Sequence, residues 1–113
     1  SGRSYFSLQN YDMAMQRFVE ALQQDRAGIL RPEIEASIGL VYLKQSNRHQ
    51  AIAYLERAVS LNPSLYDAHF FLGEAYLAIK DNAKAKKSFQ QVLNLAPRST
   101  FGQKAGNYLQ SMQ

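Results

Sequence analysis

The sequence has no cysteine, and only two of its 113 residues are histidine. Without cysteine there can be no disulfides, thiolate zinc sites or cysteine nucleophiles. Neither His49 nor His69 has a second histidine or a carboxylate four residues further on, as a metal site on one helix face would need. We therefore expect no bound metal.

Other catalytic features are also lacking. The serines lie mostly in expected turns, and no histidine is positioned to act as their base. Gly-rich loops of the kind that cradle phosphates do not occur. These absences predict a protein that is not an enzyme and that uses no cofactor.

Long apolar runs are missing as well. No uninterrupted apolar stretch reaches the roughly 18 residues of a membrane-spanning helix, so we expect no membrane span. No signal-peptide pattern is seen, and the chain opens with Ser1 rather than Met, which is typical of a processed chain or an excised segment. The compartment therefore cannot be read from the sequence.

Acidic residues are scarce in the last third of the chain. From Lys80 to the end, six cations face one acid, Asp81, whereas residues 1–79 carry seven cations and eight acids. The net charge of +4 is thus concentrated toward the C-terminus. The overall composition, 46% hydrophobic and 19% charged, is that of one ordinary globular domain covering residues 1–113.

What the sequence does contain is an internal repeat. Residues 32–65 and 66–99 align without a gap at a period of 34 residues. The paired positions are Gly39 and Gly73, Tyr42 and Tyr76, Ala51 and Ala85, Leu55 and Phe89, Ala58 and Val92, and Pro63 and Pro97. Such a period is typical of a helix-turn-helix repeat, in which each unit buries its outer face only against its neighbours.

The repeat pattern continues on both sides of these two units. Residues 1–31 match it at an offset of 37 residues and read as a partial first repeat with a longer connector, through Gly2, Tyr5, Ala14, Phe18 and Ala21. Residues 100–113 lack the glycine and the tyrosine in register and are predicted to form a closing helix, whose apolar stripe consists of Phe101, Ala105, Tyr108 and Met112.

Hydrophobic spacing predicts the individual helices. Ile34, Ile38 and Val41 recur on one helical face, Pro32 suits a first helical position, and a Ser-Asn pair after the helix supplies turn and capping chemistry. Along the whole chain, the same patterns predict seven helices, at residues 2–9, 11–24, 32–45, 48–61, 66–79, 82–95 and 99–112.

Two glycines fall inside these helices. Glycine in a helix interior costs about 1 kcal/mol relative to alanine, so Gly39 and Gly73 need a compensating gain. We expect that gain to be a close approach of the two helices of each pair, with Ala51 and Ala85 opposite the glycines.

The succession Gly-x-x-Tyr, then Ala-x-x-x-(aromatic or Leu)-x-x-Ala, then Pro, resembles the tetratricopeptide repeat over nearly the whole chain. The resemblance implies an all-α, right-handed superhelical solenoid of helix pairs that acts as a non-catalytic scaffold for a partner polypeptide. The sequence departs from the family pattern at Glu35 and His69, where a large apolar residue is common, and at Val92, where a small alanine is usual.

A second apolar stripe runs along the first helix of each unit. Ala36, Leu40 and Leu43 form another i, i+4, i+7 series, rotated away from the core stripe. In the family this face lines a concave groove. The resemblance implies that the groove consists of Phe6, Ala36, Leu40, Leu43, Lys44, Asp67, Phe70, Phe71, Glu74, Leu77, Phe101 and Lys104. Such a groove would capture an extended or helical segment of a protein partner by hydrophobic anchoring.

Within this groove, we expect Phe70 to have fewer intramolecular partners than Phe71 and to be the main anchor. The alternative is that Leu40, Leu43 and Phe71 are partly covered by neighbouring second helices and belong to the core. Some members of the family clamp a C-terminal carboxylate with lysine, asparagine and arginine on this face. Those positions hold Ala36, Leu40, Phe71, Phe101 and Ala105. A receptor for chaperone tails is therefore not expected.

Two other functions remain open. Lys80, Lys84 and Lys87 fall at i, i+4 and i+7, with Lys86 beside them, and could bind nucleic acid or an acidic partner. Because no aromatic residue is interleaved with them, a solvated helix face is the preferred interpretation and nucleic acid is not expected. The stronger alternative is an architectural segment of a larger protein whose groove or ends mediate self-association.

Overall fold

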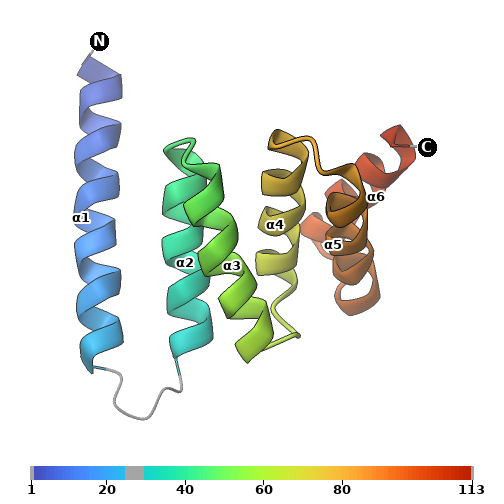
Figure 1. Ribbon diagram of the computed structural model, residues 1–113, viewed down its shortest axis with the longest axis horizontal. Coiled ribbons are helices and arrows are strands. Elements are labelled where there is room, and N and C mark those ends of the chain that lie inside the picture. The colour runs from blue at the N-terminus through green and yellow to red at the C-terminus, as the bar shows by residue number, and fades with distance from the viewer. Residues whose placement is uncertain (1, 25–29, 113) are drawn as a thin grey trace.

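The structure is an open stack of helices. The computed structural model describes residues 2–24 and 30–112, and the surroundings of the side chains for residues 11–24 and 30–112. In these ranges the helices are α1 (Gly2–Gln24), α2 (Arg31–Lys44), α3 (Arg48–Leu61), α4 (Tyr66–Ala78), α5 (Asn82–Leu95) and α6 (Thr100–Ser111). They follow one another across the molecule, with the two termini at opposite ends (Figure 1). The predicted all-α solenoid is confirmed.

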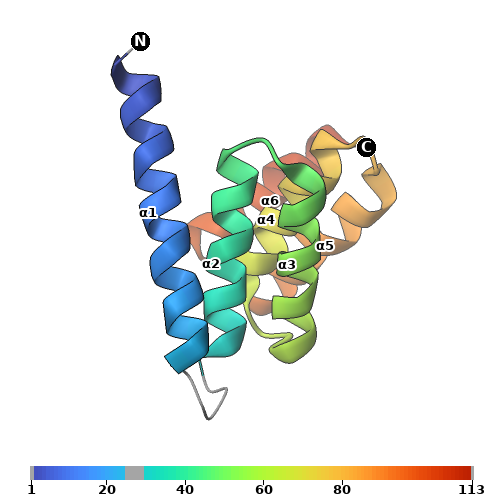
Figure 2. The same ribbon diagram turned by 60° about the vertical axis from the view of Figure 1, so that its left-hand side comes forward.

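Helix α1 differs most from the expectation. From α2 onward every helix begins and ends within one residue of its predicted bounds. At the N-terminus, however, one continuous helix replaces the two predicted at residues 2–9 and 11–24. Residues 3–24 contain neither glycine nor proline, so nothing in the chain interrupts the helix. In two views α1 extends beyond the end of α2 (Figures 1 and 2).

The turns inside the helix pairs repeat with the same period as the sequence. Ser46 and Lys80 both adopt the left-handed backbone conformation, with φ of 62° and 65°. In each turn the N–H of the following residue donates to the carbonyl of the repeat tyrosine, Tyr42 or Tyr76, at N···O distances of 2.9 and 2.8 Å. These hydrogen bonds close the end of the first helix and offset the cost of the left-handed residue.

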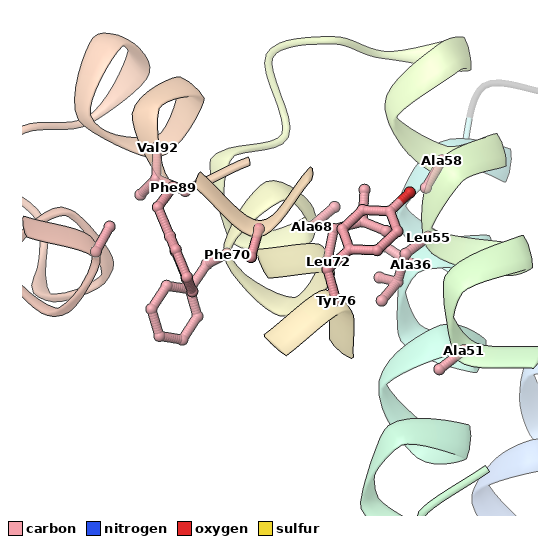
Figure 3. Close-up of a cluster of buried hydrophobic side chains, with 12 residues drawn as sticks. Ala36, Ala51, Leu55, Ala58, Ala68, Phe70, Leu72, Tyr76, Phe89 and Val92 are labelled. Carbon is pink, nitrogen blue, oxygen red and sulfur yellow. The ribbon is translucent and has the colours of Figure 1, made fainter. Parts of the chain in front are cut away.

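Helix α4 connects the two halves of the core. Leu72 and Tyr76 lie on the side of α2 and α3, whereas Phe70 lies on the side of α5 together with Phe89 (Figure 3). Leu55 and Phe89, which occupy equivalent positions in the two repeats, are completely buried, at 0% exposure. The core is therefore continuous along the stack, and each helix pair is stabilised by its neighbours.

The expected close approach at the two helical glycines is present. A Cβ on Gly39 would lie 2.7 Å from Cγ of Leu55 and 3.1 Å from the carbonyl oxygen of Ala51. A Cβ on Gly73 would lie 2.5 Å from the ring of Phe89, so at this site the atoms nearest to the glycine come from Phe89 rather than from Ala85. In both pairs the missing side chain makes room for a large residue of the second helix.

Glu35, which stands where the repeat pattern commonly has a large apolar residue, places a carboxylate in the core. Its side chain is 3% exposed, and Oε1 lies 3.7 Å from Nε of Arg31 and 3.9 Å from Nε of Arg57. Oε2 has no hydrogen-bond partner among the described residues. Burying a carboxylate carries a desolvation cost that two long, partly solvated ion pairs offset only in part. A large apolar residue, which is common here in the family, avoids that cost.

Candidate functional site

The packing of the helices gives the stack an inner and an outer face. The first helices of successive units touch one another, α2 against α4 and α4 against α6. The second helices α3 and α5 both pack on α4 but share no contact with each other within the described ranges. When successive helices are closer together on one side of a stack than on the other, the stack curves and the side with the closer helices becomes concave. The side formed by α2, α4 and α6 is therefore concave, and the side of α3 and α5 is convex.

The C-terminal end of the concave face carries a groove of about 380 Å³ between α4 and α6. Its walls are formed by Phe70, Glu74, Lys104, Asn107, Tyr108 and Ser111. Three of these, Phe70, Glu74 and Lys104, belong to the groove that the sequence predicts. The volume lies within the range of sites that receive a ligand or a few side chains of a peptide.

A tyrosine–carboxylate pair spans this concave groove. The Tyr108 hydroxyl donates to Oε2 of Glu74 at 3.0 Å. Burial, followed by the hydrogen bond to Glu74 and the charge of its carboxylate, raises the pKa of Tyr108 above its ordinary value. The hydroxyl therefore stays protonated to a higher pH than that of an ordinary tyrosine, and it remains a donor to the carboxylate. Lys104 is exposed at the edge, so the groove offers one anion and one cation beside aromatic rings.

The expectation for Phe70 is wrong. Phe70 is 3% exposed, whereas Phe71 is only partly buried. The ring centroid of Phe70 lies 5.0 Å from that of Phe101, 5.8 Å from that of Phe89 and 6.0 Å from that of Tyr108. Helix α6 closes over α4 and brings two of these rings onto Phe70. Only part of the Phe70 ring remains available to the concave groove, and the residue belongs mainly to the core.

The other predicted groove residues differ in burial. Ala36 is buried, at 9% exposure, and Lys44 is exposed. Asp67 is partly buried, and its Oδ1 accepts a hydrogen bond from the N–H of Ala68 at 2.9 Å. Phe6 lies outside the residues whose side chains the structure describes. The partly buried apolar members are Leu40, Leu43, Phe71, Leu77 and Phe101.

Several of these apolar residues belong to the core, as the alternative interpretation of the sequence had it. Leu43, Phe71, Leu77 and Phe101 pack against the central hydrophobic cluster. Leu40 is partly exposed and is not among the residues packed on that cluster. Ile38, which is 1% exposed, is also outside that cluster, so Leu40 can still pack on other core residues.

Sequence reasoning missed three residues of the concave groove: Asn107, Tyr108 and Ser111. For this segment the sequence predicts only a closing helix, because the glycine and the tyrosine of the repeat are lacking in register. A signal was nevertheless present, because Tyr108 follows Glu74 by 34 residues, the repeat period. One further step of the period places Tyr108 and Ser111 on the face that carries Glu74 and Leu77.

No cluster of three or more histidine, aspartate or glutamate side chains capable of holding a metal occurs in the described part of the chain. None of the helices in the same ranges combines the length and the apolar character that crossing a bilayer requires.

Stacked helix pairs with a concave inner face define the class of helical-repeat solenoids. Within that class, the family model of the tetratricopeptide repeat matches residues 37–100, more than half of the chain. The chain belongs to the tetratricopeptide repeat family, whose domains are non-enzymatic modules for protein–protein interaction.

Two human proteins are similar in sequence. The chain is 38% identical to Superkiller complex protein 3 over 63 residues, which cover 56% of the chain and 4% of that protein. It is 30% identical to Intraflagellar transport protein 88 homolog over 96 residues, which cover 83% of the chain and 12% of that protein. The chain thus spans a small part of the length of these relatives.

Solved structures resemble the whole stack. The first tetratricopeptide domain of Spaghetti (RPAP3), solved with the HSP90 peptide SRMEEVD, has a TM-score of 0.80 at 26% identity and covers 98% of this chain and 83% of its own. The Arabidopsis OM64 domain has a TM-score of 0.79 at 17% identity, with 99% and 90% covered. MamA has a TM-score of 0.70 at 20% identity, with 98% and 67% covered, and these last two similarities concern the fold alone.

Proposed function

We propose that this chain binds a segment of a partner polypeptide along the concave face of α2, α4 and α6. The observation that carries the proposal is the groove between α4 and α6, where Glu74, Lys104 and Tyr108 present polar groups beside aromatic rings. Support comes from the RPAP3 domain, which was solved with a peptide bound and shares the fold.

The proposed surface differs along its length. Toward the N-terminus it offers the partly exposed apolar side chain of Leu40, with Lys44 one turn further along α2. Toward the C-terminus it offers the Glu74 carboxylate, held by Tyr108, and the Lys104 ammonium. A matching partner segment has an apolar residue for the first part and hydrogen-bonding or charged groups for the second.

The partner segment is expected to differ from the acidic HSP90 tail. The positions at which related domains clamp a terminal carboxylate hold apolar residues, of which Ala36 and Ala105 are buried. A peptide that ends in a free carboxylate would find no paired cations at these positions. We therefore expect weak or no binding of the peptide SRMEEVD.

The experiment starts from peptides of random sequence selected for binding to the 113-residue chain. The dissociation constant of a selected peptide is then measured with Leu40→Asp and with Lys104→Glu. Each substitution is expected to weaken binding by about tenfold or more, because each changes one end of the proposed surface. Helical circular dichroism should be retained in both variants. The melting temperature should change little for Lys104→Glu, because Lys104 is exposed, and fall further for Leu40→Asp, because Leu40 is partly buried.

Leu95→Asp is the matched control. Leu95 is 39% exposed on α5, outside the concave face, so the same change in polarity there should leave the dissociation constant within about threefold. Equal loss with all three variants, or selected peptides that bind all three as tightly as the parent chain, would contradict the concave site. Loss of helicity in Leu40→Asp would instead assign Leu40 to the core.

Self-association is a second candidate, favoured by the surface of α1. In the described part of the chain α1 packs only on α2, and its Met13 and Val19 side chains are 54% and 42% exposed. If this face pairs two copies, light scattering should show a mass that rises with concentration, and Val19→Glu should restore the monomer mass. A monomer mass at every concentration would rule out this candidate.

A further inference from the structure

The convex side of the stack carries a groove of its own, of about 340 Å³, that the concave site does not use. It exists because α3 and α5 both pack on α4 without touching each other in the described ranges. The residues around it are Glu56, Val59, His69, Leu72, Tyr76, Lys84, Lys87, Ser88 and Gln91. A trench between neighbouring second helices is thus open to solvent.

The floor of this convex groove is apolar and preformed. Leu72 and Tyr76 of α4 are 3% and 7% exposed, and the partly buried Val59 of α3 forms one wall. These side chains are fixed by the core, so a ligand meets a surface that is already ordered. Like the concave groove, the convex groove has room for a few side chains of a peptide, one of them large and apolar, rather than for a whole folded element.

The rim of the convex groove is positively charged. Lys84 and Lys87 are both exposed on α5, and no described carboxylate forms an ion pair with either of them. The Lys84 ammonium lies 5.6 Å from the centroid of the Tyr76 ring, a cation–π contact that holds it over the floor. The groove therefore combines an apolar base with two cations that have no ion-pair partner among the described residues.

The negative and titratable groups near the rim have other partners. Glu56, the one acid that lines the groove, accepts a hydrogen bond from the Tyr76 hydroxyl. The Asp81 side chain accepts from the backbone N–H of Lys84 and caps α5. Nε2 of His69 lies 3.0 Å from the carbonyl oxygen of Pro63. Glu56 and Asp81 keep their negative charges, but within the described residues neither of them forms an ion pair with Lys84 or Lys87.

We propose that the convex groove between α3 and α5 binds an acidic segment of a protein partner, with one large apolar side chain on the floor and flanking carboxylates at Lys84 and Lys87. Charge complementarity selects this occupant, and the excess of cations from Lys80 onward steers it to this end of the stack.

The test uses a fluorescein-labelled peptide of nine residues in which phenylalanine is flanked on both sides by aspartate and glutamate. Its affinity for the 113-residue chain is measured by fluorescence anisotropy at low ionic strength. The double variant Lys84→Glu/Lys87→Glu should weaken binding by about tenfold or more, because it reverses both rim charges. A peptide with glycine in place of phenylalanine should bind the parent chain about fivefold more weakly, because it leaves the floor empty.

The control double variant is Lys86→Glu/Arg98→Glu. It makes the same change in net charge at exposed positions that do not line the groove, and should weaken binding by less than about threefold. Circular dichroism of both double variants establishes that the helices are intact. Backbone amide shifts in the parent chain should change at Val59, Leu72 and Gln91 and remain constant along α6.

Four results would overturn the proposal. They are equal losses in the two double variants, equal affinity of the phenylalanine and glycine peptides, amide shifts confined to the concave side, and stronger competition by an oligothymidylate than by the unlabelled peptide. The first and last would indicate general attraction of anions by a basic surface. Because Leu40 and Lys104 lie outside the convex groove, the concave proposal stands or fails independently of these results.

Discussion

Replacing Phe89 with alanine is expected to lower the free energy of unfolding by about 3–5 kcal/mol. Phe89 is the largest completely buried side chain of the described residues. Its ring stacks on Tyr108 of α6 with a centroid distance of 4.7 Å and an interplanar angle of 9°, and fills the space that Gly73 leaves on α4. Urea unfolding followed by circular dichroism measures the change.

The substitution of Phe89 should also disturb the shape of the concave groove. Phe89 contacts both Phe70 and Tyr108, which line that groove, so the cavity left by alanine lies directly behind it. Leu95→Ala on the same helix is the control, because Leu95 is 39% exposed, and it should cost less than about 1 kcal/mol. Similar losses for the two variants would mean that α5 and α6 are not joined through Phe89.

A methyl group at Gly102 is expected to cost about 3 kcal/mol of stability. A Cβ there would lie 2.2 Å from the carbonyl oxygen of Ala96 and 2.9 Å from the backbone of Pro97. Because the obstructing atoms belong to the backbone, they cannot turn aside as a side chain would, and Gly102→Ala should displace α6 from the end of α5. Thermal unfolding of the variant measures the loss.

Gly106→Ala, on the same helix, is expected to raise the stability rather than lower it. The nearest atom to a Cβ at Gly106 is Cδ2 of Leu93 at 3.9 Å, an ordinary contact. Alanine also favours the helix, so this variant should gain about 0.5–1 kcal/mol. If Gly102→Ala were as stable as Gly106→Ala, the packing of α6 against the connection after α5 would differ from that described.

The two proposed binding faces share a structural origin. Contacts among α2, α4 and α6 bring the inner helices together, and the same curvature separates α3 from α5. Helix α4 therefore contributes to both grooves, through Phe70 and Glu74 on the concave side and Leu72 and Tyr76 on the convex side. Tyr76 fixes the Glu56 carboxylate on one side, as Tyr108 fixes that of Glu74 on the other.

The fold was predicted closely because its determinants are local and periodic. The spacing of Ile34, Ile38 and Val41, the prolines and the 34-residue period define helices α2 to α6 to within one residue. The break predicted near residue 10 depended on analogy with the later units, and the chain has no glycine or proline there to cause it. The helix-forming residues around position 10 therefore continue α1 through the predicted break.

The candidate sites were predicted less well, because they depend on which helix covers which side chain. Phe70 and Phe71 are adjacent in sequence, and their periodicity does not reveal that α6 places Phe101 and Tyr108 over the first rather than the second. The lysines of α5 showed no interleaved aromatic residue, because Tyr76 reaches Lys84 from a different helix.

The amino-acid sequence by itself determined the repeat, the helix pairs and the positions where glycine admits a large neighbour, since each follows from residue spacing and backbone preference. Only the tertiary structure decided which apolar side chains are buried in the core and which remain at a surface. Exposure is set by the curvature of the stack and by the helices on either side, and those contacts join residues about one repeat apart.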